Sequence, residues 1–276
     1  MKNHKPRIGH MDIFNYQTFD TSLSKKTRSL TLTFKRETIN REMLFELEGL
    51  FNWLSSKIEI STLILTSHSD IFCQGIDLED WKDKGPSELQ AFLKRFSKLT
   101  NALTYLPQTV IADLRTDVAA EGIELALCAD IRIARSGLSL NFNFLERGLM
   151  PQAPMYERAH QLFGMQNLKN WIYSKKKPST ETLIHNGFLL STYAANEEIS
   201  EILTYLRDVS PISRLQSKMA FKVYDVDFEK ERIEKIDSFQ MATLSIEDWK
   251  KEKEDFTPAR EIGSTLKRKE VEKNYA

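Results

Sequence analysis

The sequence predicts a mixed α/β protein with a mostly parallel sheet, followed by a helical C-terminal part. In the first half, short apolar segments typical of strands alternate with longer segments of helical period, which is the pattern of βαβ units. From about residue 153 onward the pattern is helical almost throughout. Pro178 and Pro211 mark breaks there, and Gly187 marks a helix end or kink.

The predicted elements follow one another in a regular order. Residues 30–34, LTLTF, alternate apolar and Thr side chains and predict a half-buried strand. Asn40 is placed to cap a helix whose apolar residues recur at helical spacing through Leu54. Further strands are predicted at 62–66, 109–114 and 131–134, and further helices at 87–106 and 123–129.

Composition indicates an ordinary globular protein with a full hydrophobic core. The 276 residues include 39 basic and 39 acidic side chains, so bulk charge favours neither nucleic acid nor a membrane as a partner. Cys73 and Cys128 form neither a disulfide framework nor a metal-ligand spacing, which predicts a reduced protein without a metal. The N-terminus lacks the apolar core of a signal peptide, and no apolar run approaches 18 residues. We therefore expect a cytoplasmic protein.

Two segments carry a resemblance to a known family. Residues 62–81, TLILTSHSDIFCQGIDLEDW, contain the pattern FxxGxDL after a strand. Residues 106–164 contain GxELALxxDIRIA and then a strand leading into GLxP. In this order and spacing the motifs resemble the crotonase superfamily, that is, enoyl-CoA hydratases and isomerases. Weaker resemblance extends over 30–221, about two thirds of the chain. An unrelated α/β protein with the same apolar runs is the alternative, but it leaves the matching offsets of the motifs unexplained.

The resemblance implies a fold as well as an activity. It implies a spiral of ββα units with a helical C-terminal trimerisation region, and a homotrimer or a dimer of trimers. The chain then divides into a crotonase-like core at 1–210 and a helical C-terminal region and tail at 211–276. Within the latter, residues 229–276 are rich in Lys and Glu and are expected to form a trimer-face helix and a frayed tail.

The family stabilises the enolate-like oxyanion of an acyl-CoA thioester with two backbone N–H groups, an oxyanion hole. By resemblance these donors are the N–H groups of Ile76 and Glu121, the second at a helix start, which favours negative charge. The family usually has small residues at both positions. Here Gly122 alone remains of a cluster of glycines, after Ala119, Ala120 and Glu121, so the resemblance leaves the geometry of the hole open.

Hydratases of this family use two glutamates as general acid and general base. The first corresponds to Glu124, for which a capping or ion-paired carboxylate in a first helical turn is the alternative interpretation. The second corresponds to Phe144, which cannot transfer a proton. Glu146 would share the face of Phe144 if the strand continued, but we expect it at the surface. Glu121 is the second candidate acid/base.

Coenzyme A is expected as part of the substrate, with no covalently bound cofactor. By resemblance it is bound largely by backbone in the loop of the first motif, at Phe72, Gln74, Gly75, Ile76 and Leu78. Glu37 and Glu79 stand where the family often has basic side chains.

The sequence thus favours an acyl-CoA-binding enzyme that hydrates, dehydrates or isomerises an enoyl-CoA. The alternative is an inactive paralogue of the same fold that binds acyl-CoA or a protein partner, which the substitution at Phe144 favours.

Overall fold

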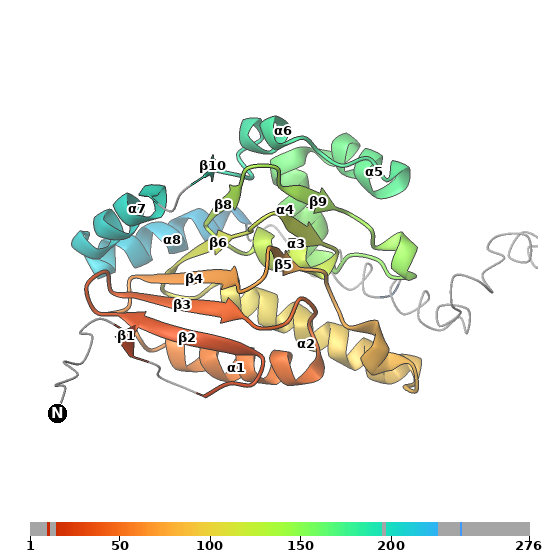
Figure 1. Ribbon diagram of the computed structural model, residues 1–276, viewed down its shortest axis with the longest axis horizontal. Helices are drawn as coiled ribbons and strands as arrows, with labels where there is room; N and C mark the ends of the chain where they lie inside the picture. The colour runs from red at the N-terminus through yellow and green to blue at the C-terminus, as the bar shows by residue number, and fades with distance from the viewer. Residues whose placement is uncertain (1–9, 12–14, 195–196, 226–237, 239–276) are drawn as a thin grey trace, which may run out of the picture.

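A seven-stranded sheet and a three-stranded sheet form the framework of the molecule (Figure 1). The computed structural model describes residues 10–11, 15–194, 197–225 and 238. The large sheet is antiparallel at its first three strands and parallel from the third strand onward. In spatial order its strands are β1 (His10–Met11), β2 (Phe19–Ser24), β3 (Ser29–Phe34), β4 (Thr62–Ser67), β6 (Thr109–Asp113), β8 (Ile131–Arg135) and β10 (Ser191–Tyr193).

The small sheet is parallel and is built from three-residue strands. These are β5 (Ile71–Cys73), β7 (Asp117–Ala119) and β9 (Ser139–Asn141). Each follows a strand of the large sheet directly, and a helix then follows each pair, which is the repeated ββα unit expected from the resemblance.

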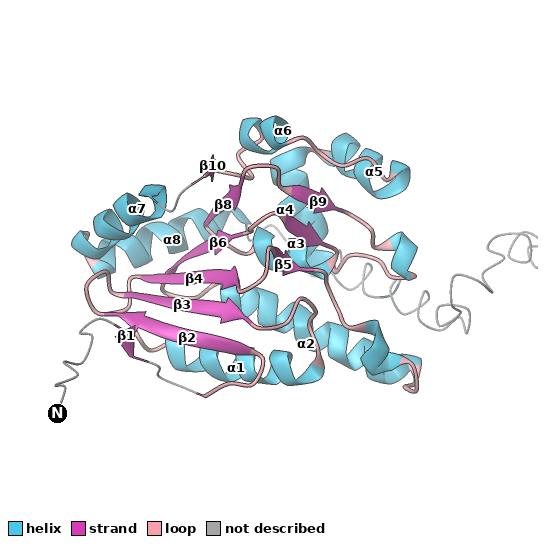
Figure 2. Ribbon diagram, in the orientation of Figure 1, coloured by secondary structure: helices cyan, strands magenta, loops and turns pink. Residues whose placement is uncertain are grey.

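Helices surround the two sheets (Figure 2). They are α1 (Arg41–Leu54), α2 (Pro86–Thr104), α3 (Glu121–Leu127), α4 (Ala153–Phe163), α5 (Met165–Ser174), α6 (Thr180–His185), α7 (Glu197–Asp208) and α8 (Pro211–Asp225), with 3-10 turns η1 (Leu78–Trp81) and η2 (Leu145–Arg147). The predicted cap of α1 is present, since the Asn40 side chain accepts from the Met43 N–H at 2.9 Å.

The trimer-face helix predicted at 229–276 lies outside the described residues apart from position 238, and the division at residue 210 stays a prediction.

Two details of the fold were not apparent from the sequence. The C-terminal part is not wholly helical, because β10 pairs in parallel with β8. The strand that precedes GLxP ends at Asn141 and does not continue to Glu146, which lies in η2.

The central strands β4 and β6 of the large sheet are buried on both faces. The main core contains the apolar face of α1, including Leu44 and Leu47, together with the sheet residues Leu30 and Leu63. On the opposite face, Ile64 and Ile111 pack against Leu203 of α7. Parallel strands covered on both faces read as continuous apolar runs, which is why these strands were visible in the sequence.

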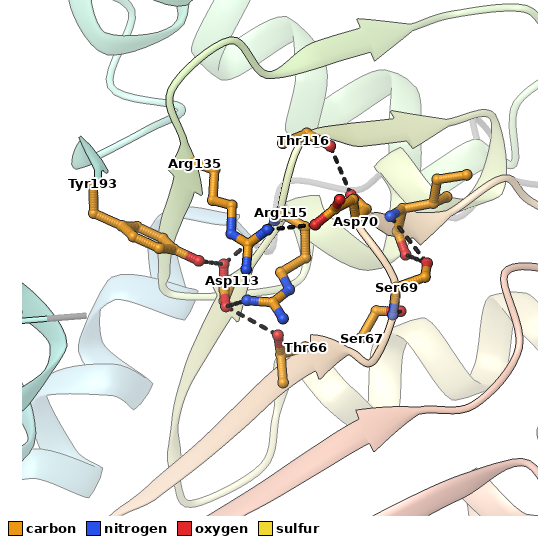
Figure 3. Close-up of polar contacts among 10 residues, drawn as sticks. Thr66, Ser67, Ser69, Asp70, Asp113, Arg115, Thr116, Arg135 and Tyr193 are labelled. Atoms are coloured by element: carbon orange, nitrogen blue, oxygen red, sulfur yellow. Dashed lines mark hydrogen bonds and ion pairs between the residues drawn. The ribbon is translucent and has the colours of Figure 1, made fainter. Parts of the chain in front are cut away.

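A buried carboxylate joins the ends of three strands of the large sheet (Figure 3). Asp113 is 5% exposed and accepts from the Tyr193 hydroxyl at 2.6 Å and from the Thr66 hydroxyl at 2.9 Å. The Arg115 backbone N–H also donates to it, at 3.3 Å. These bonds fix the corners at which the chain leaves β4 and β6 for β5 and β7. Because β5 leads into the FxxGxDL loop and β7 into α3, this network places both halves of the site described next.

Candidate active site

The backbone on either side of Ile76 is held by the segment that precedes α1. The Ile39 N–H donates to the Gly75 carbonyl, and the Ile39 carbonyl accepts from the Asp77 N–H, both at 2.9 Å. In such a parallel bridge the N–H and C=O of the middle residue point the opposite way. Ile76 therefore directs its N–H and C=O away from Ile39. Its N–H meets Glu121 at the start of α3, and its C=O meets Arg147 of η2.

The start of α3 depends on an unusual backbone conformation at Ala120. This residue has φ 46° and ψ −124°, a region that glycine occupies far more readily than alanine. Its N–H donates to the Asn141 carbonyl of β9 at 3.1 Å, which ties the turn to the small sheet. Glu121 is then the first residue of α3, a position whose N–H has no helical acceptor.

The Glu121 side chain contacts the first predicted oxyanion donor, the Ile76 N–H. Its Oε2 accepts from the Ile76 N–H at 2.9 Å, and the side chain is fully buried. Its Oε1 is also buried and has no hydrogen-bond partner among the described residues. The first predicted donor thus lies against the side chain of the residue that carries the second, and this carboxylate of the chain itself accepts its hydrogen bond.

Arg147, which we did not single out from the sequence, completes this arrangement. Its guanidinium donates to the carbonyl oxygens of Gln74 and Ile76, and its Nη2 lies 3.7 Å from Glu121 Oε2. Its Nε is buried without a hydrogen-bond partner among the described residues. A signal for it existed, since Arg147 directly precedes Gly148 of the GLxP motif, but no periodicity connects it with Glu121.

Glu124 lies one helical turn after Glu121 and is 2% exposed. Its Oε1 accepts from the Gln152 N–H at 3.1 Å, at the start of α4. Burial raises the pKa of this carboxyl well above its usual value, and the nearby Glu121 raises it further, while the Gln152 N–H and Arg158 act in the opposite direction. A carboxyl group with a raised pKa retains its proton closer to neutral pH, which suits acid/base work.

The position of the second hydratase glutamate is apolar in the structure. Phe144 is 0% exposed and belongs to the main hydrophobic core. Glu146 does not replace it, because its carboxylate pairs with Lys175 at 3.1 Å and its side chain is 32% exposed. Glu146 is therefore the surface residue that we expected.

The five predicted CoA-binding residues run from Phe72 within β5, through the loop after it, to Leu78 at the start of η1. Phe72, Gly75 and Ile76 are buried, whereas Gln74 and Leu78 are half-buried. Gly75 has φ +92°, and a Cβ there would collide with the Glu121 carboxylate and lie 2.9 Å from the Ala120 Cβ. Their contact with CoA stays a prediction.

Other groups near the loop carry charge or sulfur. Acidic residues flank the loop in the sequence, but a basic residue that we missed, Arg36, pairs with Asp77 at 2.8 Å. Burial raises the pKa of the buried Cys73 thiol to about 12, so this thiol keeps its proton at neutral pH.

Tyr156 on α4 is a further group that we missed. Burial, followed by the neighbouring Tyr173 and Glu124, raises the pKa of its phenol to about 12. Tyr156 therefore retains its proton at neutral pH near Glu124, and it can donate a hydrogen bond but cannot act as a base there.

No three His, Cys, Asp or Glu side chains among the described residues are grouped so as to hold a metal ion. No helix within the described ranges is long and apolar enough to cross a membrane.

The comparisons with known proteins agree on one family. The family model for enoyl-CoA hydratase/isomerase matches residues 29–258. An enoyl-CoA isomerase/hydratase, fer4, of Mycosarcoma maydis is 32% identical over 113 residues, which are 41% of this chain and 41% of that protein. A probable mitochondrial enoyl-CoA hydratase 2 of Arabidopsis thaliana is 25% identical over 197 residues, 70% of this chain and 65% of the relative. The chain thus matches about two fifths to just under two thirds of the length of these relatives, and its own cytoplasmic location stays a prediction.

Solved structures resemble the fold at low sequence identity. An enoyl-CoA hydratase from Bacillus halodurans superposes with a TM-score of 0.75 at 17% identity, over 84% of this chain and 97% of the other. An enoyl-CoA hydratase from Bacillus anthracis gives 0.71 at 22% identity, over 81% and 90%. These likenesses show the fold, and the family model covers most of the chain. The chain therefore belongs to the enoyl-CoA hydratase/isomerase family of the crotonase superfamily.

Proposed function

We propose that this chain is an acyl-CoA-binding enzyme of the enoyl-CoA hydratase/isomerase type, with one acid/base carboxyl group in place of the usual two. The observation that carries the proposal is the convergence of Ile76 and α3. The Ile76 N–H points at the first turn of α3, where Glu121 lies, and Glu124 follows one turn later with a buried carboxyl.

The oxyanion part of the reaction rests on two backbone donors. A thioester carbonyl would accept from the N–H groups of Ile76 and Glu121, which hold fixed positions before any charge develops. Each such donor is worth about 3 kcal/mol in the transition state of related acyl chemistry. For this to happen the Glu121 carboxylate must leave the Ile76 N–H.

Glu124 is the proposed proton carrier. In double-bond isomerisation its carboxylate would remove a proton from one carbon of the acyl chain, leaving an enolate, and the resulting acid would return that proton to another carbon. One carboxyl group suffices for this balance. Hydration is the other reaction of the family that this residue could perform: the water oxygen would bond to the β carbon while Glu124 takes a proton from that water and delivers it to the α carbon.

A second candidate function is supported by Phe144 and by the Glu121 carboxylate. A buried phenylalanine at the second acid/base position and a carboxylate on an oxyanion donor both suit an inactive paralogue that binds acyl-CoA or a protein. The proposed trimer, or dimer of trimers, would serve either function.

Calorimetric titration of the purified protein separates these possibilities. A saturated acyl-CoA, which can be neither hydrated nor isomerised, is titrated beside free CoA. Affinity that depends on the acyl group supports a working pocket, whereas no binding at millimolar ligand would overturn the acyl-CoA proposal.

Turnover of short and long enoyl-CoA substrates is then measured for the wild type and for Glu124→Gln. The proposal expects activity in the wild type and a loss of about a hundredfold or more in the variant, the usual contribution of a general acid/base. Equal turnover by the two proteins would exclude Glu124 as the proton carrier. Acyl-CoA binding without turnover would favour the inactive paralogue.

A further inference from the structure

Two side chains of the site form an ion pair, yet each has one buried polar atom without a hydrogen-bond partner among the described residues. Glu121 Oε1 and Arg147 Nε are buried and have no hydrogen-bond partner among the described residues. Their side chains are nonetheless ion-paired through Oε2 and Nη2, at 3.7 Å. Buried polar atoms are nearly always paired, so an acceptor and a donor left without partners on the two residues of one ion pair indicate a second arrangement of the same two side chains.

We propose that the Glu121 carboxylate is an intrinsic gate on the Ile76 N–H, and that Arg147 is the positioning residue that receives this carboxylate when an acyl-CoA thioester binds. In the closed arrangement, Glu121 Oε2 accepts from Ile76, as the structure has it. In the open arrangement, both carboxylate oxygens accept from Arg147, and the Ile76 N–H is available to the thioester oxygen.

Arg147 has the hydrogen-bonding capacity for this second role. A guanidinium carries five N–H donors, and the bonds to the Gln74 and Ile76 carbonyls use two of them. The remaining donors include Nε, and arginine readily holds a carboxylate through two parallel bonds. The carboxylate would stay buried and paired in both arrangements, so opening the gate would not leave an isolated charge in the protein interior.

The geometry also explains why the gate would act on thioesters in particular. Glu121 and a thioester carbonyl compete for a single donor, and a ligand without a carbonyl oxygen does not need that donor. Only protein in the open arrangement can bind the thioester carbonyl, so the apparent affinity is reduced to the extent that the closed arrangement is populated. The gate therefore predicts that the thioester binds more weakly than it would without the gate, whereas the affinity for the carbonyl-free analogue is unaffected.

The inference rests on the proposed function, and its test uses a matched pair of ligands. One is a saturated acyl-CoA thioester, and the other is the corresponding alkyl-CoA thioether, which lacks the carbonyl oxygen. Binding is measured by calorimetry for the wild type, Glu121→Ala, Arg147→Met and the double variant. Glu146→Gln is the control, because it removes a carboxylate one residue from Arg147 that pairs outward with Lys175.

The gate predicts that E121A binds the thioester about tenfold more tightly than the wild type, with little change for the thioether. It also predicts that R147M weakens thioester binding when Glu121 is present, and has little effect in the E121A background. That coupling separates a receiving residue from a purely structural clamp of the loop. E146Q should match the wild type with both ligands.

Three results would overturn the gate. Equal thioester affinity of the wild type and E121A would do so, as would equal tightening for both ligands, which would indicate added space alone. Equal weakening by R147M in both backgrounds would assign Arg147 to the loop only. The proposed function survives each of these results, whereas no binding of either ligand to the wild type and to E121A would overturn both proposals.

Folding of the arginine variant is checked by circular dichroism and thermal unfolding. If R147M does not fold, Arg147→Lys provides the same test, because it retains the charge and loses the planar pair of donors. R147K is then expected to weaken thioester binding in the presence of Glu121 and to have little effect in the E121A background, and equal weakening in both would overturn the receiving role.

Discussion

Gly122 of α3 lies directly against the backbone of Cys73 in β5. A Cβ built at Gly122 would overlap the Cys73 carbonyl oxygen and lie 2.8 Å from the Cys73 Cβ. The contact joins the helix that carries Glu121 and Glu124 to the strand that leads into the Ile76 loop. It gives a physical reason why a glycine remains at this one position of the turn.

Gly122→Ala should therefore destabilise the protein by about 2–3 kcal/mol, because the helix or the strand must move to admit a methyl group. Urea unfolding measures the effect. Gly49→Ala is the matched control, since Gly49 lies in α1 with nothing within 4 Å of the added Cβ. There the same substitution should stabilise by about 0.5–1 kcal/mol through helix propensity. Similar effects at the two glycines would contradict the close packing of α3 on β5.

Glu124→Gln should stabilise the fold increasingly as the pH rises. The pKa of Glu124 is raised in the folded chain, so the unfolded chain releases this proton at lower pH and binds fewer protons than the folded chain. The wild type therefore loses stability as the pH rises from the unfolded pKa, near 4.5, through the folded pKa. Glutamine has no such proton and still offers an oxygen to the Gln152 N–H.

Urea unfolding of both proteins between about pH 5 and about pH 8 checks this expectation. The difference in unfolding free energy, variant minus wild type, should grow with pH. Repeating the series in high salt separates the burial of Glu124 from surface charge, which salt screens. A difference that stays constant, or shrinks, would show that Glu124 is not held with a raised pKa.

The strained turn before α3 can be tested with two neighbouring alanines. Ala119 and Ala120 are both fully buried, but only Ala120 has a positive φ. Each substitution by glycine removes one buried methyl group, and only Ala120→Gly also relieves backbone strain. A120G should therefore be more stable than A119G by about 1–2 kcal/mol in urea unfolding. The reverse order would contradict the assigned conformation of the turn.

Removing the Asp113 carboxylate should lower the stability of the fold more than removing one of the hydroxyl groups that donate to it. Tyr193→Phe removes one of several bonds to Asp113 and should cost about 1.5 kcal/mol. Asp113→Ala leaves the Thr66 and Tyr193 hydroxyls without their acceptor and should cost about 3 kcal/mol or more. Thermal or urea unfolding of the two variants checks the order, and equal losses would show that Asp113 does not join the strands cooperatively.

The long elements could be predicted from the sequence because their burial is continuous. The strand at 62–66 and the helix after Asn40 display clear apolar patterns, and both are present. The three-residue strands of the small sheet are too short to display any period, so they came only from the family resemblance. β2 was missed, and its half-buried, polar-rich sequence explains why.

The candidate site was predictable in its backbone and not in its side chains. The motifs singled out Ile76 and Glu121, and the structure brings the Ile76 N–H within 2.9 Å of the Glu121 carboxylate. The position of the Glu121 carboxylate depends on the φ of Ala120 and on the guanidinium of Arg147, 26 residues later in the chain. Neither a backbone angle nor a contact at that separation leaves a periodic trace in the sequence.

The bridge between Ile39 and Ile76 has a consequence for how this protein tolerates change. The direction of the Ile76 N–H is set by the segment entering α1, which belongs to the first ββα unit and contains neither Glu121 nor Glu124. Substitutions in the segment entering α1 would keep the fold but rotate the Ile76 N–H. They would therefore change which ligands the protein prefers without changing its stability. Residues near the beginning of the chain thus determine the direction of a hydrogen-bond donor whose own residue lies later in the sequence.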